Sequence, residues 1–141
     1  MQFTLGKMYA KGEEVPYDAK EAEKWLREAA GHGDANMQFF VGQLYREVGE
    51  LVVQDREEAV SWFQKAAEQG HVLAKFNLGV MYLNGEGIQV DMVQAHKWLT
   101  LAAASGNKDA LEKIKMAETR MSQNQIKEAQ VLAEEWLAKH R

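Results

Sequence analysis

The chain has 141 residues, of which 46% are hydrophobic, and its 17 basic and 21 acidic residues give a formal net charge of −4. This length suits one domain with a continuous core, and the interspersed charges form no basic stripe that could neutralise phosphates, so we expect no nucleic-acid partner. The lack of cysteine excludes disulfides and thiolate metal sites, and it leaves the compartment open.

The apolar segments of the sequence are too short to cross a membrane. The longest span only a few residues, whereas a membrane helix needs roughly 20, and no charged and then apolar signal segment opens the chain. We therefore expect no membrane insertion. The compartment stays unknown: a soluble protein of the cytoplasm, or of the periplasm if an N-terminal signal has been removed, fits the sequence.

Two short patterns recur along the chain and predict helical repeats. A Leu/Val-Gly-x-x-Tyr pattern occurs as LGKMY, VGQLY and LGVMY at residues 5–9, 41–45 and 78–82. Each copy precedes a segment with Trp, Ala-Ala and a closing Gly, and the tryptophans are spaced by 37 and 36 residues at Trp25, Trp62 and Trp98. A single proline and abundant Ala, Leu, Glu, Lys, Gln and Met favour helix. Such a period is typical of a solenoid, whose units bury their apolar faces against each other.

Polar residues and glycines predict where the second helix of each unit begins and ends. Each second helix is preceded by an aspartate, whose carboxylate can accept hydrogen bonds from the free N–H groups at the helix start. Glu or Gln follows three residues later, as in a capping box. These pairs are Asp18 and Glu21, Asp55 and Glu58, and Asp91 and Gln94. The closing glycine can adopt the left-handed conformation that ends a helix. The closing positions are Gly33, Gly70 and Gly106. The glycine in the first helix should allow another helix to approach closely.

Both ends of the chain depart from this pattern. Lys115 and Glu118 stand where the other units have glycine and tyrosine, and Ser122 with Gln125 predicts a capping box for a last helix. We expect residues 107–141 to form a C-terminal helical cap. The repeats before it occupy residues 1–33, 34–70 and 71–106. The first repeat lacks about three residues at its start relative to the third, so we expect the sequence to be a fragment or a trimmed chain.

The order of these residues closely resembles the Sel1-like repeat, a relative of the tetratricopeptide repeat. The resemblance rests on Leu-Gly-x-x-Tyr, a Gly-bearing loop, Asp-x-x-x-Ala-x-x-Trp, and then Ala-Ala and Gly, and it covers residues 1–106. A tetratricopeptide unit has about 34 residues and a proline near its end. The step here is 36 or 37 residues and lacks that proline. The resemblance implies an all-α, right-handed α/α solenoid that acts as a protein-binding scaffold.

No set of residues in the sequence predicts catalysis, a metal site or a cofactor. Caps and solvated helix faces account for the acidic residues, and the glycine-rich segment Gly85-Glu86-Gly87 is expected to form a turn. The histidines lack metal-ligand spacing and are expected on the surface; they are His32, His71, His96 and His140. Some cysteine-rich Sel1-like proteins are linked to penicillin binding or β-lactamase activity, so an enzyme of that type is an alternative. This chain lacks their cysteines and shows no nucleophile beside a base.

The first helix of each unit is the expected binding surface, because these helices line the concave side of stacked helical pairs. Phe3, Phe39 and Phe76 recur in register and are expected to pack between successive first helices. Residues that differ between units are candidates for contact with a protein or peptide. They are Lys7, Asn36, Gln43, Arg46, Leu73, Val80 and Leu83. Basic residues at one end of such a groove and apolar residues at the other would suit an extended or helical peptide that has an acidic segment.

The predicted function is therefore a non-catalytic scaffold or adaptor that binds a protein or peptide on its concave face. Self-association is a further alternative. It would use the N-terminal face or the loop of the middle unit, residues 46–55, which is one residue longer than its counterparts and contains Leu51-Val52-Val53.

Overall fold

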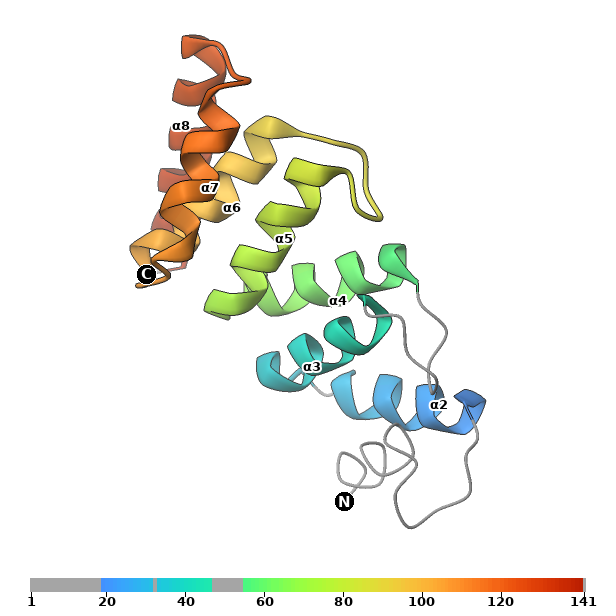
Figure 1. Cartoon of the computed structure of the whole chain (residues 1–141). Coiled ribbons are helices and arrows are strands. Elements are labelled where there is room, and N and C mark those ends of the chain that lie inside the picture. The colour runs from blue at the N-terminus through green and yellow to red at the C-terminus, as the bar shows by residue number, and fades with distance from the viewer. Residues whose placement is uncertain (1–18, 32, 47–54, 141) are drawn as a thin grey trace.

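A computed structural model describes residues 19–31, 33–46 and 55–140 of the chain. All regular secondary structure in these residues is helical, as predicted, and the helices are labelled in Figure 1. They are α2 (Ala19–Ala30), α3 (Ala35–Arg46), α4 (Arg56–Glu68), α5 (Val72–Asn84), α6 (Met92–Ala104), α7 (Asp109–Glu118) and α8 (Gln123–Lys139). The predictions for the first helix, for Asp18 and for the Leu51-Val52-Val53 segment lie outside the described residues.

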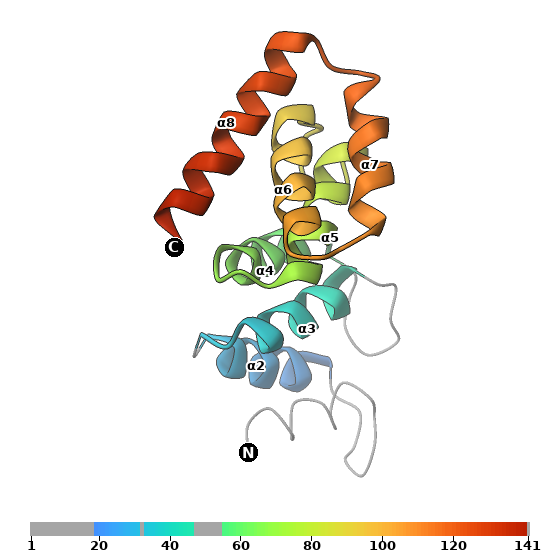
Figure 2. The same ribbon diagram turned by 90° about the vertical axis from the view of Figure 1, so that its left-hand side faces the viewer.

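The helices stack in chain order, from α2 at one end of the molecule to α7 and α8 at the other (Figures 1 and 2). α3, α5 and α7 are the first helices of their units, and α2, α4, α6 and α8 are the second helices. α3 packs mainly on α4, and α5 packs mainly on α6. α6 also contacts both α7 and α8, which flank it at the C-terminal end of the stack. This is the arrangement of an α/α solenoid.

Side-chain caps fix the starts of three helices, as predicted. At α4 and at α6, an aspartate Oδ1 accepts a hydrogen bond at 3.0 Å from the backbone N–H three residues later. Ser122 and Gln125 form a complete box at α8, because each side chain accepts a hydrogen bond from the backbone N–H of the other residue. The closing glycines have the predicted left-handed φ angles, which are 92°, 93° and 103° at Gly33, Gly70 and Gly106.

Glu58 does not close the capping box that the sequence predicts at the start of α4. Its Oε1 instead accepts a hydrogen bond from the indole Nε1–H of Trp62 at 3.2 Å. The same oxygen lies 3.3 Å from Nη2 of Arg27, which belongs to α2. The carboxylate thus satisfies the one polar group of a buried indole and joins two second helices of successive units.

Two of the three recurring tryptophans belong to the core. Trp62 and Trp98 are buried, and Trp25 is half-buried. The ring of Trp98 lies edge-on to that of Trp136 in α8, with centroids 6.1 Å apart and an interplanar angle of 71°. A buried tryptophan removes a large apolar area from water and can add edge-to-face attraction. The repeated position is therefore structural.

Glycines in the first helices allow α3 and α5 to lie unusually close to their partners, as predicted. A Cβ placed on Gly79 would lie 2.7 Å from Leu99 Cγ, and one placed on Gly42 would lie 2.8 Å from the ring of Phe63. Atoms cannot pack at these distances, so even alanine would force the helices apart. Both Phe63 and Leu99 are fully buried against the glycine surface.

Replacing Gly79 by alanine should lower the free energy of unfolding by about 1 to 3 kcal/mol, because the clash with Leu99 outweighs a gain of about 1 kcal/mol in helix propensity. The cost should shrink in a Leu99→Ala background, since the clashing atoms are then absent. Chemical denaturation of the four proteins measures both costs. Equal costs in the two backgrounds would contradict the close approach of α5 and α6.

Candidate functional site

Two of the predicted binding residues are buried. Val80 is 8% exposed and lies in a cluster with Leu99 and Ala110. Leu83 is 3% exposed and packs in a cluster with Ala117. These two side chains form part of the core between α5, α6 and α7, in place of the exposed groove expected from the sequence. The reason is that α7, the first helix of the last unit, covers this side of α5.

Two positions that differ between units, those of Arg46 and Val80, lie where successive units meet. Arg46 Nε donates a hydrogen bond to Glu86 Oε2 at 2.7 Å, and Nη2 donates one to Oε1 at 3.4 Å. The ring of Phe39 stacks on that of His71 at 4.6 Å. α3 thus meets the α5 unit through an ion pair and an aromatic stack, whereas α5 meets α7 through aliphatic contacts such as that of Val80. Arg46 and Val80 differ from their counterparts and take part in junctions of different chemistry, whereas Phe39 belongs to the phenylalanine position that recurs.

Three predicted binding residues keep accessible side chains. Asn36 and Leu73 are exposed, and Gln43 is half-buried. Lys7 lies outside the described residues. None of the three side chains lines a hollow over α4 or beside the end of α8.

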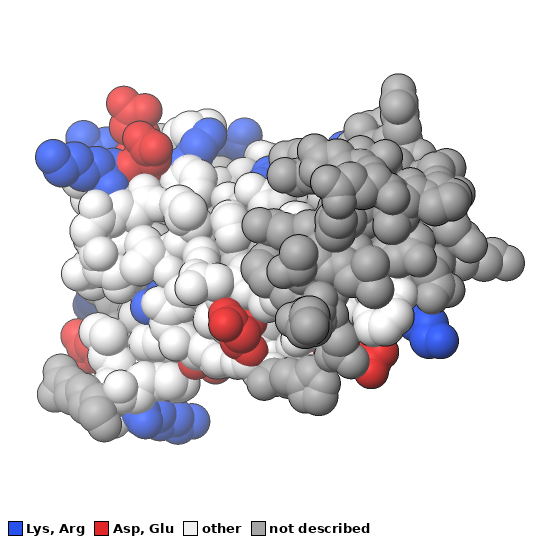
Figure 3. Space-filling view, turned by 90° about the horizontal axis from the view of Figure 1, so that it is seen from below, with Lys and Arg blue, Asp and Glu red and all other residues white. Residues whose placement is uncertain are grey.

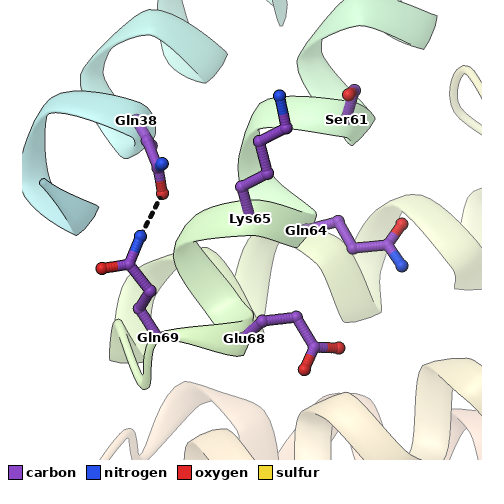
Figure 4. A pocket seen from close by; sticks show the side chains of 6 residues that line it. All are labelled: Gln38, Ser61, Gln64, Lys65, Glu68 and Gln69. Atoms are coloured by element: carbon purple, nitrogen blue, oxygen red, sulfur yellow. Dashed lines mark hydrogen bonds between the residues drawn. The ribbon is translucent and has the colours of Figure 1, made fainter. Parts of the chain in front are cut away.

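An open hollow of about 470 Å³ lies over α4 and beside α3 (Figure 4). We call it the polar hollow; its lining residues are Gln38, Ser61, Gln64, Lys65, Glu68 and Gln69. Gln69 Nε2 donates a hydrogen bond to Gln38 Oε1 at 2.7 Å, and Gln38 Nε2 donates one to the carbonyl of Ala30 at 3.4 Å. This chain of amides holds the α3 wall of the hollow in place.

A second hollow of about 190 Å³ adjoins the first, because Glu68 lines both. We call it the Trp136 hollow; its lining residues are Glu68, Lys97, Leu132, Glu135, Trp136, Lys139 and His140. They come from α4, α6 and α8 and from the residue after α8. Figure 2 shows the C-terminal end of α8 approaching the α4 part of the stack.

The wall shared by the two hollows is held by contacts between α4 and α8. Glu68 Oε2 accepts a hydrogen bond from Trp136 Nε1–H at 3.2 Å, and His140 Nε2 lies 3.9 Å from the same oxygen. The rings of His140 and Trp136 stack at 3.8 Å, with an interplanar angle of 11°. The carboxylate of Glu68 in α4 therefore binds the indole of Trp136, and the ring of His140 stacks on that indole.

A polar contact between the first helix and the end of the second helix occurs in two successive units, with different residues in each. Gln38 and Lys75 occupy equivalent positions 37 residues apart, and both are buried. Lys75 Nζ donates a hydrogen bond to Ser105 Oγ at 3.4 Å, in the place of the Gln38 to Gln69 contact. The ammonium also lies 4.4 Å from the ring centroid of Trp136. Burial lowers the pKa of Lys75 below its usual value.

Ammonium groups rest on the tryptophan faces around both hollows. Lys65 Nζ lies 4.3 Å from the ring centroid of Trp62, and Lys97 Nζ lies 4.5 Å from that of Trp98. Burial lowers the pKa of Lys97, and the positive charge of Lys139 lowers it too, whereas nearby glutamates raise it. Each ammonium gains cation–π attraction in these positions.

His96 is buried, which corrects the expectation that the histidines lie on the surface. It is 2% exposed, its Nε2 lies 2.7 Å from Glu118 Oε2, and its Nδ1 lies 3.2 Å from Thr100 Oγ1. Glu118 occupies the position that Tyr82 has in the preceding unit. The last unit thus replaces the tyrosine with a carboxylate that the histidine can bind.

Charged and metal-binding side chains are scattered over the part of the chain that the structure describes. Within those residues, no group of three or more His, Asp and Glu side chains could hold a metal ion. On the face seen in Figure 3, charged side chains lie mostly near the edges, and both signs occur. Across the described helices, none combines the length and apolar character needed to cross a bilayer.

One contact at the polar hollow, that of Gln38 with Gln69, has a signal in the sequence. Gln38 and Lys75 are polar residues at a position of the first helix that packs against the end of the second helix. The partners Gln69 and Ser105 are 36 residues apart, so the pairing follows the repeat. The contribution of Trp136 has no such signal, because α8 lies beyond the three repeats.

The stacked helix pairs define a helical repeat protein of the solenoid class. A family model described as the Sel1 repeat matches residues 1–34, 35–71 and 72–107. The chain therefore belongs to the Sel1 repeat family. Sel1 repeat proteins are generally protein-interaction scaffolds.

Solved structures of bacterial proteins resemble this fold. A protective antigen of uropathogenic Escherichia coli that displays an SLR fold is 30% identical, with a TM-score of 0.81 over 99% of this chain and 30% of that one. A Sel1 repeat protein from Oxalobacter formigenes is 34% identical, with a TM-score of 0.69 over 82% of this chain and 47% of that one. Helicobacter pylori cysteine rich protein B shares the fold, with 21% identity and a TM-score of 0.60 over 77% of this chain and 88% of that one.

The chain spans less than half of the first two of these proteins, 30% and 47% of their lengths. No protein with curated functional information matches the sequence significantly.

Replacing Arg46 by glutamate should lower the free energy of unfolding by about 1 to 3 kcal/mol, because it removes two charge-assisted hydrogen bonds and places a second carboxylate beside Glu86. The exchanged pair, Arg46→Glu with Glu86→Arg, should recover part of this loss. Lys127→Glu, an exposed charge reversal in α8, serves as the control and should change stability little. If thermal unfolding shows equal effects for Arg46→Glu and Lys127→Glu, Arg46 does not join the two units.

Proposed function

We propose that this protein is a non-catalytic scaffold that binds an extended segment of a partner protein along the polar hollow and the adjoining Trp136 hollow. The observation that carries the proposal is the wall that the two hollows share at Glu68, which places about 470 Å³ and about 190 Å³ of accessible space side by side. Together the two hollows have the volume that ligand pockets of proteins typically have.

The polar hollow suits the main chain of a peptide. Five of its six lining residues belong to α4 or to the residue after it, so the recess follows one helix. Ser61 and Gln64 are exposed there, and hydroxyl and amide groups can both donate and accept hydrogen bonds. An extended segment presents N–H and C=O groups that need such partners.

The Trp136 hollow suits a side chain of the same segment. Leu132 and Trp136 supply apolar walls, and the hydrogen bond to Glu68 leaves the indole fixed in position. Aromatic side chains of this kind contribute strongly to binding because they bury a large area with little loss of conformational entropy.

A second candidate surface is the concave side of the first helices. The exposed Leu73, with 52% of its surface accessible, favours it, and Asn36 and Gln43 are also accessible. Lys7 would belong to the same surface. Arg46 contributes less there, because Glu86 already engages its guanidinium.

Two alternatives to the proposed function are self-association and hydrolysis of β-lactams, and each has its own test. A self-associating module would show a mass above that of one chain in light scattering. An enzyme of the β-lactamase type would hydrolyse nitrocefin. If either property is observed, and if a point substitution that leaves the protein folded abolishes it, that function should be adopted in place of the proposed one.

Filling the polar hollow should weaken binding. Peptides selected from a phage-displayed random library on the whole chain provide the probe, and Gln64→Trp should reduce their affinity roughly tenfold or more by occupying the recess. Gln130→Trp, which adds the same side chain to an exposed site of α8, is the control and should leave the affinity unchanged. Fluorescence polarisation measures both. Peptides that ignore Gln64→Trp but are lost on Leu73→Asp would move the site to the concave side.

A further inference from the structure

We propose that the junction between α3 and α5 responds to acid: the imidazole of His71 holds the start of α5 while the ring is neutral, and protonation of the ring loosens that start. His71 lies between α4 and α5 and contacts α3. This inference goes beyond the proposed function and does not depend on it, because it concerns how two units of the solenoid are joined.

The first helices α3, α5 and α7 begin with equivalent side-chain caps that use different acceptors. In each cap, a side chain accepts a hydrogen bond from the backbone N–H three residues later, at 3.2, 3.2 and 3.1 Å. The accepting residues, which are 37 and 36 positions apart, are Asp34, His71 and Asn107. Aspartate and asparagine are preferred at the start of a helix, whereas histidine is not. Of the three caps, that of α5 is the one whose acceptor takes up a proton close to neutral pH.

The cap of α5 requires the neutral form of the ring. Nδ1 of His71 accepts the backbone N–H of Ala74 only while that nitrogen carries no proton, so the ring proton lies on Nε2. Protonation would turn Nδ1 into a donor that faces another donor. It would also place a positive charge at the N-terminal end of α5, where the helix dipole favours negative charge. Acid therefore removes an attraction and adds a repulsion at the same helix end.

The ring that caps α5 is also a contact between units. It stacks on the ring of Phe39 in α3, with centroids 4.6 Å apart and an interplanar angle of 18°. Phe39 in turn lies 5.6 Å from the ring of Phe63 in α4. Because one imidazole makes both contacts, a turn of the ring that separates Nδ1 from the N–H of Ala74 also disturbs the stack. A proton at His71 thus acts on α3 and α5 together.

The charged groups around His71 do not hold the proton on the ring. Asp34, just before α3, is the acidic group that favours the charged imidazole. The charged side chain of α5 is Lys75, whose ammonium is turned to a serine and a tryptophan of other helices. At the end of α4, Glu68 accepts an indole N–H and Lys65 rests on an indole ring. Asp34 is therefore the one of these groups that opposes the effect of burial.

The direction of the pH dependence follows from these surroundings. Burial lowers the pKa of His71, and the smaller effect of Asp34 raises it. The unfolded chain therefore takes up the proton more readily than the folded chain does. The contribution of the neutral ring to stability is complete above the usual pKa of histidine, about 6.5, and is lost as the pH falls from there through the lowered pKa.

Hydrogen exchange of single backbone amides, followed by NMR on the whole chain, tests the inference. The protection factor of the Ala74 N–H should fall roughly fivefold between about pH 8 and about pH 5, which is the effect of losing a typical N-cap contact. The N–H groups of Glu58 and Gln94 are internal controls, because the carboxylates of Asp55 and Asp91 cap them. Their protection factors should stay constant over the same range.

A matched substitution identifies the group that titrates. His71→Asn keeps a side chain that caps helices well but does not titrate, so the protection of the Ala74 N–H should no longer depend on pH. If circular dichroism shows that this variant does not fold, His71→Asp gives the same test with the acceptor that α4 and α6 use. The ring ¹⁵N chemical shifts of the unmodified protein should show Nδ1 without a proton at about pH 8.

Three results would overturn the inference. An equal fall in protection at Ala74, Glu58 and Gln94 would show that acid acts on the whole fold. A fall at Ala74 that persists in the His71 variants would assign the effect to another group. A proton on Nδ1 at about pH 8 would show that the ring does not accept the N–H of Ala74.

Discussion

The close approach of α5 to α6, and of α3 to α4, is the constraint on which the rest of the structure depends. Gly79 and Gly42 leave no room for a side chain against Leu99 and Phe63. Because each helix pair is set at this short distance, the next pair meets a surface of fixed shape, and a continuous core can form through the stack. Every other contact between units, including those around the hollows, relies on that spacing.

The sequence predicted the parts of the fold that local chemistry decides. Asp55, Asp91 and Ser122 cap helices as expected, and Gly70 has a left-handed φ of 93°. Each of these features depends on residues within three or four positions of one another and recurs with the repeat. Glu58 shows the limit of such local reasoning, because the Asp55 N–H that its carboxylate would accept in a capping box donates instead to the carbonyl of Tyr45.

The candidate site was harder to predict, because variation between repeats has two physical causes. Val80 and Arg46 differ from their counterparts since they join successive units, and a binding surface would produce the same variation. The contact of Trp136 with Glu68 joins residues 68 positions apart. Because α8 lies beyond the three repeats, the repeat period does not predict how α8 packs on α4. That contact forms the wall between the two hollows, so the last helix both closes the core and shapes the surface to which we assign binding.

A crystal structure of the chain with its most strongly selected peptide would test this assignment most directly. The account predicts that the peptide main chain follows α4 past Gln64 and that a side chain of the peptide enters the Trp136 hollow. Peptide density over Asn36 and Leu73, with both hollows left open, would contradict it.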